Sequence, residues 1–232
     1  MIGTPKKTFE ILKKHGFTFK KSLGQNFLID ANILNRIVDG AGVNGNVGVI
    51  EIGPGIGSLT EALAKKAKKV ISFEIDGRLL PILSETLADY PNVEIINNDI
   101  LKVDVDKIIA EKMSDCEKIM VVANLPYYIT TPILTHLIEN TEKIDGYVVM
   151  MQKEVANRLN AKVGTKDYNS LTILLNYYTD VEYLFTVPKK VFVPAPNVES
   201  AVVKIMTKET REFETDAKFF KFVRSCFVQR RK

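Results

Sequence analysis

The segment Asn124-Leu125-Pro126-Tyr127 carries residue types that could orient an aromatic amine for alkylation. The exocyclic amine of adenine is a poor nucleophile because its lone pair is delocalised into the ring. Two acceptors against its N–H bonds, the Asn124 side-chain oxygen and the Leu125 carbonyl, would favour a pyramidal nitrogen as a bond to carbon forms, which stabilises the transition state. Pro126 restricts the loop, and Tyr127 offers a face on which a base can stack. The alternative is an ordinary turn with an aromatic plug.

A second aromatic residue, Phe192, precedes two prolines that favour an extended loop, Pro194 and Pro196. We expect Phe192 to close the opposite face of the base, with a place in the core as the alternative. Basic residues would contact the phosphate backbone, and a base that reaches the pocket must be flipped or already unpaired. These basic residues are Lys20, Lys21, Arg158, Lys189, Lys190, Arg230 and Arg231.

A glycine-rich turn, Gly53-Pro54-Gly55-Ile56-Gly57, follows an apolar run and precedes an amphipathic segment. Glycine permits positive φ angles and leaves no Cβ to obstruct a ligand. The spacing is G-x-G-x-G, whereas the dinucleotide fingerprint is G-x-G-x-x-G. The turn therefore favours a ligand without a pyrophosphate, while a dinucleotide site and a purely structural turn remain alternatives.

Two acidic residues extend this predicted cofactor site. Glu74 ends the next strand, where a carboxylate would accept hydrogen bonds from a ribose diol. Asp99 follows the third strand and could accept a bond from an adenine amine. Asp76 lies beyond the strand end, and we expect it to cap a helix that starts near Gly77. The implied ligand is an adenosine that carries something other than a diphosphate.

Alternating β-rich and helical patterns predict a parallel α/β sheet that positions these residues. Strands are expected at 47–52, 70–74, 93–97, 119–123, 146–151, 181–187 and 200–206. Helices are expected at 58–67, 77–89, 132–139, 153–161 and, after a polar stretch, 217–232. Four strands end at Gly53, Glu74, Asp99 and Asn124, so these residues should meet at the carboxyl edge, where open α/β sheets bind ligands.

Composition excludes several classes of protein. The chain has 232 residues, a net charge of +4 and 46% hydrophobic residues, which argues against a disordered or low-complexity protein. The two cysteines and two histidines lie far apart, so neither a disulfide framework nor a metal site is expected. The N-terminus lacks the apolar core of a secretion signal, and no later run is long enough to span a membrane. We therefore expect a cytoplasmic protein.

Eight segments together resemble the KsgA-type rRNA adenine dimethyltransferases, in family order along nearly the whole chain. They are KSLGQNFL, EIGPGIGSLT, FEID, NNDIL, ANLPYYITTP, MMQKEVANRL, FVPAPNVESAVV and SCFVQRRK. The resemblance implies a class I, Rossmann-like methyltransferase with a mostly parallel seven-stranded sheet and helices on both faces. It also implies use of S-adenosylmethionine to dimethylate N6 of two adjacent adenosines, in a hairpin loop near the 3′ end of 16S rRNA, as the small subunit matures.

The same resemblance assigns roles to residues. It implies that the cofactor contacts Asn26, Leu28, Gly53, Gly55, Glu74, Asp99 and Asn124, and that Asn124 to Tyr127 form the catalytic loop. From residue types alone, 25–28 reads as the lead-in to a helix. We expect a monomer with a catalytic domain at 1–207, whose basic segment 1–29 contributes to the cofactor site. Residues 208–232 are expected to begin a truncated helical domain, so that cofactor binding survives while the subunit is methylated poorly.

Three other functions fit parts of the pattern. An Erm-type enzyme, which methylates large-subunit rRNA and confers macrolide resistance, shares the fold and the Asn-x-Pro-Tyr loop. A non-catalytic ribosome assembly factor is a second alternative, although intact Asn124, Pro126 and Tyr127 argue against it. An NAD-dependent oxidoreductase is disfavoured by the glycine spacing and by the lack of a recognisable Tyr-Lys pair.

Overall fold

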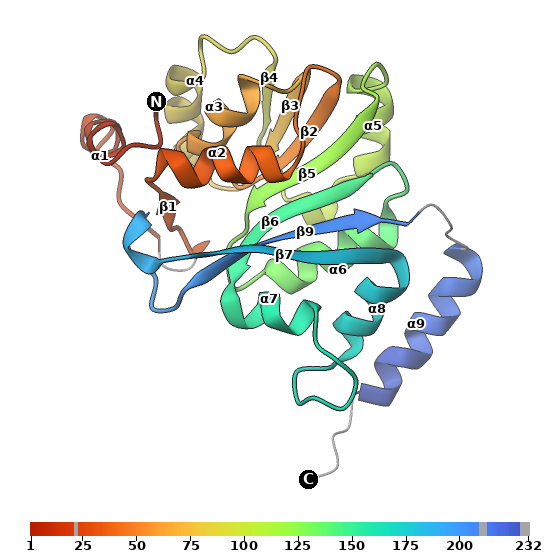
Figure 1. The fold of residues 1–232 in the computed structure, drawn as a ribbon. Helices are drawn as coiled ribbons and strands as arrows, with labels where there is room; N and C mark the ends of the chain where they lie inside the picture. Colours follow the sequence, from red (N-terminus) through yellow and green to blue (C-terminus); the bar gives the residue numbers. More distant parts are fainter. Residues whose placement is uncertain (21–22, 209–212, 228–232) are drawn as a thin grey trace.

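A seven-stranded sheet forms the centre of the protein in the computed structural model, which describes residues 1–20, 23–208 and 213–227 (Figure 1). The strand order is β4-β3-β2-β5-β6-β9-β7. Strands β2 to β6 pair in parallel, and β9 pairs antiparallel with both β6 and β7. The bounds are β2 Val47–Ile52, β3 Lys69–Phe73, β4 Val93–Ile96, β5 Lys118–Asn124, β6 Gly146–Gln152, β7 Thr179–Val187 and β9 Ser200–Thr207.

Helices cover both faces of this sheet. They are α1 Pro5–Lys14, α2 Ala31–Gly40, α3 Ser58–Ala64, α4 Leu80–Thr86, α5 Val105–Lys112, α6 Thr130–Asn140, α7 Lys153–Leu159, α8 Ser170–Tyr178 and α9 Phe213–Phe227. Short 3-10 helices follow strands or loops within the described residues, among them η2 Gly77–Leu79, η3 Ile100–Lys102 and η4 Lys189–Val191. A separate two-stranded ribbon pairs β1 Phe27–Leu28 with β8 Phe192–Val193.

Side chains that alternate along each strand build one core on each face of the sheet. In β2, Val47 and Val49 pack with α2 and α3, whereas Ile50 and Ile52 pack with the helices of the other face, α5 to α8. All six residues of β2 are buried, as expected for a parallel strand covered on both sides. A third cluster joins Ile11 of α1 to the helix α4 and to β1.

The expected fold class is confirmed, and each of the seven expected strands is present with its ends within two residues. Helices α1, α2, α5 and α8 were not among the predictions. Residues 25–28 do precede a helix, α2, as expected, but the two-residue strand within them was not predicted. Phe27 and Leu28 form strand β1 because they pair with β8, a partner far away in the sequence that no local pattern reveals.

The final helix α9 starts at Phe213, earlier than expected. It contacts α8, where Phe219 and Phe220 pack on Tyr177 and Tyr178 with ring centroids 5.1 to 5.5 Å apart. Phe220 is buried and belongs to the core on that face. Across the described ranges 1–20, 23–208 and 213–227, no helix has both the length and the apolar character needed to cross a membrane.

Candidate active site

A pocket opens at the carboxyl edge of the parallel strands, where β2 and β5 are neighbours although two strands separate them in sequence. At such a switch point the following loops diverge, which leaves room for a ligand. The pocket brings together the residues expected to contact the cofactor. They are Asn26, Leu28, Gly53, Gly55, Glu74, Asp99 and Asn124. The loop residues Leu125, Pro126 and Tyr127 line the same pocket.

The glycine turn requires glycine for two different reasons. Gly53 has φ +69°, and a Cβ built there would meet no atom within 4 Å, so its main chain faces open space. Gly55 has φ +60°, and a Cβ there would lie 2.9 Å from Cε1 of Phe27. Gly53 therefore leaves its main chain accessible to a ligand, while Gly55 allows β1 to pack over the turn.

Glu74 is buried beside the glycine turn with both carboxylate oxygens oriented by main-chain donors. The Asp76 N–H donates to Oε1 at 2.8 Å, and the Gly55 N–H donates to Oε2 at 3.3 Å. Burial raises the pKa of Glu74 to about 7. The neighbouring Glu51 is buried at the floor of the pocket, accepts a 2.7 Å bond from Ser72 and has its pKa raised to about 7 by the same cause. New donors directed at Glu74 would stabilise its charged form.

Both aspartates near the strand ends act as caps. Asp76 accepts the Arg78 N–H at 3.2 Å at the start of η2, which confirms the predicted cap. Asp99 lines the pocket and accepts the Leu101 N–H at 3.1 Å through Oδ1, at the start of η3. This bond uses one oxygen of Asp99 and leaves Oδ2 as an acceptor for a ligand.

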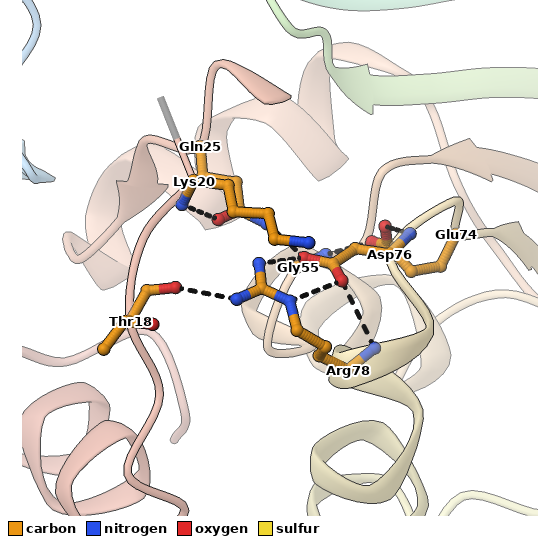
Figure 2. A network of polar contacts seen from close by, with 7 residues as sticks. All are labelled: Thr18, Lys20, Gln25, Gly55, Glu74, Asp76 and Arg78. Atoms are coloured by element: carbon orange, nitrogen blue, oxygen red, sulfur yellow. Dashed lines mark hydrogen bonds and ion pairs between the residues drawn. The ribbon is translucent and has the colours of Figure 1, made fainter. Parts of the chain in front are cut away.

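Asp76 also attaches the N-terminal segment to the end of β3 (Figure 2). Arg78 donates to both Asp76 oxygens, at 2.9 Å from Nε and 2.6 Å from Nη2, and its Nη1 donates to the Thr18 carbonyl at 3.1 Å. The Gln25 amide donates to Asp76 Oδ2 at 2.8 Å and accepts the Lys20 N–H at 2.9 Å. Bonds from Arg78 lower the pKa of Asp76 to about 2. We call Thr18, Lys20, Gln25, Asp76 and Arg78 the Asp76 network.

The Asp76 network helps to form the pocket, because the N-terminal segment that it holds in place forms one wall of the pocket. Gly24, Gln25 and Asn26 line the pocket, and the Asn26 carbonyl accepts a 3.1 Å bond from Nδ2 of Asn124. Sequence reasoning identified Asp76 as a cap but missed this second role. These contacts join residues that are far apart in sequence, so the spacing of residues along the chain could not reveal them.

The loop after β5 is held by its main chain. Leu125 is buried, and its N–H donates to the Met150 carbonyl at 3.0 Å. The Pro126 carbonyl accepts a 3.0 Å bond from Thr130 Oγ1. Tyr127 shares a 2.6 Å hydrogen bond with Ser200 of β9, and burial raises the pKa of its hydroxyl. Because Asn124 donates to the Asn26 carbonyl through Nδ2, its Oδ1 can still serve as an acceptor for an amine.

Phe192 is not brought to the pocket. It is 3% exposed, lies in β8 and packs in the core with α2 and α3 residues, so the structure places it in the alternative position that we considered. A clamp on the second face of a base is not formed by this residue in the structure. The sequence pattern could not separate the two roles because both favour an aromatic residue before a rigid loop.

The basic residues expected to contact a phosphate backbone differ in their surroundings. Lys20 and Lys190 are exposed. Lys189 is exposed and donates to the Asn197 carbonyl at 3.1 Å, while Arg158 pairs with Glu154 one turn earlier in α7. Lys21, Arg230 and Arg231 lie outside the residues that the structure describes.

The polar and apolar groups that line the pocket fit an adenosine-containing ligand. Glu74 and Asp99 supply acceptors, apolar side chains such as Phe73 and Ile75 form the pocket between them, and Gly53 leaves its main chain open. Ser58, the first residue of α3, is buried with its hydroxyl aimed at no hydrogen-bond partner among the described residues, and it also lines the pocket. The hydroxyl oxygen is itself covered by protein atoms, so Ser58 contributes to the pocket wall without offering this oxygen to a ligand in the present arrangement. Sequence reasoning had missed Ser58.

Comparison with known proteins gives a consistent result. A family model described as "Ribosomal RNA adenine dimethylase" matches residues 16–232. A "Ribosomal RNA small subunit methyltransferase A" from Staphylococcus haemolyticus is 60% identical over 100% of this chain and 79% of its own length. A dimethyladenosine transferase from Plasmodium falciparum has 32% identity and a TM-score of 0.76, over 88% of this chain and 72% of that one. The 23S rRNA methyltransferase ErmE has 29% identity and a TM-score of 0.69, over 87% and 78%.

Proposed function

The chain belongs to the ribosomal RNA adenine dimethylase family, and we propose that it dimethylates N6 of two adjacent adenosines in the 3′-terminal hairpin loop of 16S rRNA. As a member of this family it is an S-adenosylmethionine-dependent methyltransferase. The observation that carries the proposal is that one pocket holds both the predicted cofactor residues and the loop from Asn124 to Tyr127. The modification would take place while the small subunit matures.

We assign the cofactor contacts from the chemistry of each side chain. Glu74 would accept bonds from the ribose diol, Asp99 from the adenine amine, and the main chain at Gly53 would lie against the ligand. When bound, S-adenosylmethionine supplies a methyl group on a sulfonium centre that is open to direct in-line displacement. Asn26 and Leu28 would close the wall on the side of the N-terminal segment.

The loop after β5 would orient the adenine amine for methyl transfer. Asn124 Oδ1 and the Leu125 carbonyl would accept the two N6 hydrogens, which directs the nitrogen lone pair towards the methyl group. Tyr127 would stack on the adenine, held in place by its bond to Ser200. No general base is needed beforehand, because the proton becomes acidic once the nitrogen is alkylated.

Two alternatives remain to be compared with this proposal. The large-subunit reaction is favoured only by the likeness to ErmE, at 29% identity, whereas the relative named for the small subunit is 60% identical. A non-catalytic assembly factor is disfavoured because the Asn124 to Tyr127 loop is intact and faces the pocket. We also propose a cytoplasmic monomer, with the catalytic domain at 1–207 and the start of a helical domain at 208–232.

The test is transfer of labelled methyl groups from S-adenosylmethionine, run in parallel on unmethylated small subunits and on naked 23S rRNA. We expect N6-dimethyladenosine in 16S rRNA. Which RNA carries the label distinguishes the proposed reaction from the alternatives, whatever the rate of methyl transfer. Label in 23S rRNA would favour the Erm-type reaction, and absence of label in both, with cofactor binding intact by calorimetry, would favour an assembly factor.

An Arg78→Met substitution tests whether the Asp76 network supports cofactor binding. We expect the Kd for S-adenosylmethionine to rise about three- to tenfold. The segment that leads into the wall loses its bond from Arg78 to the Thr18 carbonyl. Asp76, which accepts the bond from Gln25, also loses its ion pair with Arg78 and is held less firmly. The kcat at saturating cofactor should stay within about twofold. Calorimetry and steady-state kinetics give the two constants.

The matched control is Lys66→Met, which removes an exposed ion pair with Asp39 (2.6 Å) away from the pocket. Its Kd should equal that of the wild type. A similar increase in both variants, or a Kd unchanged by Arg78→Met, would contradict the assigned role.

A further inference from the structure

Tyr128 lies at the pocket but has no part in the roles assigned above. Its side chain is 56% exposed, although it lines the same pocket as Asn124 and Tyr127. Tyr127, its neighbour in the loop, is partly buried and hydrogen-bonded to Ser200. The loop therefore presents two consecutive tyrosines to one pocket, the first anchored in the protein and the second with much of its ring open to solvent.

The open ring has a solid support on one side. Gly24 in the N-terminal segment has φ +59°, and a Cβ built there would lie 3.2 Å from Cδ1 and 3.5 Å from Cε1 of Tyr128. Pro126 lies against the same point, with its Cβ 3.6 Å away. The Gly24 main chain can approach the ring this closely because it carries no side chain. Tyr128 is thus backed by the pocket wall while the rest of its ring remains accessible.

An aromatic ring that is supported on one side and lies beside the pocket could stack on a second base, the one adjacent to the base that enters the pocket. When a base leaves a stack, its neighbour loses a stacking partner and exposes an apolar face, which is costly in water. An aromatic side chain can cover that face with little dependence on sequence, because every base has a π-face. The proposed substrate has two adjacent adenosines, so the neighbour is itself a target.

We propose that Tyr128 stacks on the nucleobase adjacent to the adenosine held in the pocket, and so determines how the pair of nucleotides is placed. This inference rests on the proposed function in requiring an RNA substrate with an unstacked base. Tyr128 then acts as a substrate-positioning residue that is not among the residues assigned to the cofactor. Its removal should weaken RNA binding without changing cofactor binding.

The experiment compares Tyr128→Leu and Tyr128→Phe with wild type on unmethylated small subunits. Loss of one stacking contact predicts a KM for subunits, and a Kd by filter binding, about tenfold higher in Tyr128→Leu. Tyr128→Phe keeps the ring and should behave as wild type. The Kd for S-adenosylmethionine should be the same in all three, which also verifies that the variants fold. We expect Tyr128→Leu to shift the ratio of dimethylation at the two adenosines.

The matched control is Phe9→Leu, an aromatic residue on α1 that is 53% exposed and does not line the pocket. It should bind subunits as wild type does. Equal subunit binding by Tyr128→Leu and wild type would overturn the inference, as would a loss in Tyr128→Phe as large as that in Tyr128→Leu.

Failure of the proposed function gives a different signature. It would be seen with wild type alone, as label in the wrong RNA or in none. In the first case the same series is repeated on the RNA that is labelled. In the second, filter binding still compares the variants, since it needs no turnover.

Discussion

An Asn124→Ala variant is expected to lose about 10²- to 10³-fold in kcat while it still binds S-adenosylmethionine. The side chain lines the pocket beside the buried Leu125. Its Oδ1 is the acceptor that we propose for the amine, and this acceptor matters most as charge develops on the attacking nitrogen. The lost bond from Nδ2 to the Asn26 carbonyl should raise the cofactor Kd only a few-fold. Single-turnover methyl transfer with saturating cofactor measures the chemical step.

Asn124→Asp separates the two functions of this side chain. It retains an acceptor but removes the donor to the Asn26 carbonyl, so its main defect should be in the cofactor Kd. Asn160→Ala, an exposed position at the end of α7, serves as the control and should change neither constant. Equal losses in kcat and in cofactor affinity for Asn124→Ala would contradict the role in orienting the amine.

A Glu74→Ala variant is expected to have the opposite profile, with the cofactor Kd raised about 10- to 100-fold and the kcat at saturation little changed. The carboxylate is held by the N–H groups of Gly55 and Asp76, and its remaining lone pairs are the acceptors for a ribose diol. Calorimetry gives the Kd. A thermal melt shows how much stability is lost when the two N–H groups have no partner.

The raised pKa of Glu74 gives this prediction a pH dependence. Burial raises the pKa to about 7, so part of the population is protonated at neutral pH in the unliganded protein. The hydroxyls of a diol donate more strongly to a carboxylate than to the neutral acid, so binding favours release of that proton. The Kd of the wild type should therefore increase as the pH falls below about 7 and level off above it. Glu74→Gln should lose this part of the dependence, and a wild-type Kd that improves on acidification would contradict it.

The positions at the strand ends could be predicted from the sequence because each interrupts an apolar run. Gly53, Glu74, Asp99 and Asn124 follow strands that are apolar enough to be recognised without a structure, and the carboxyl edge of a parallel sheet then brings them together. This reasoning required only the order of strands and helices. It placed these four residues correctly because the strands β2 to β5 pair in parallel, so that their carboxyl ends lie at the same edge of the sheet.

Features that depend on distant contacts could not be predicted in the same way. Phe27 pairs with Val193, and no local pattern indicates a strand of two residues. Phe192 has the same sequence context whether it faces a ligand or the core, and only the packing with α2 and α3 decides. Asp76 was predicted as a cap from its neighbours, but its bond to Gln25 depends on where the N-terminal segment lies.

The pairing of β1 with β8 also constrains the order in which the pocket can be completed during synthesis. Strands β2 to β5 can associate as soon as they leave the ribosomal tunnel, because they are close in sequence. The wall formed by Gly24 to Leu28 acquires its strand partner only when Phe192 and Val193 have emerged. Loop-closure entropy makes such long-range pairing late in folding as well. A nascent chain thus carries its glycine turn and Glu74 long before it can enclose a ligand, and we expect cofactor capture only after Val193 has emerged.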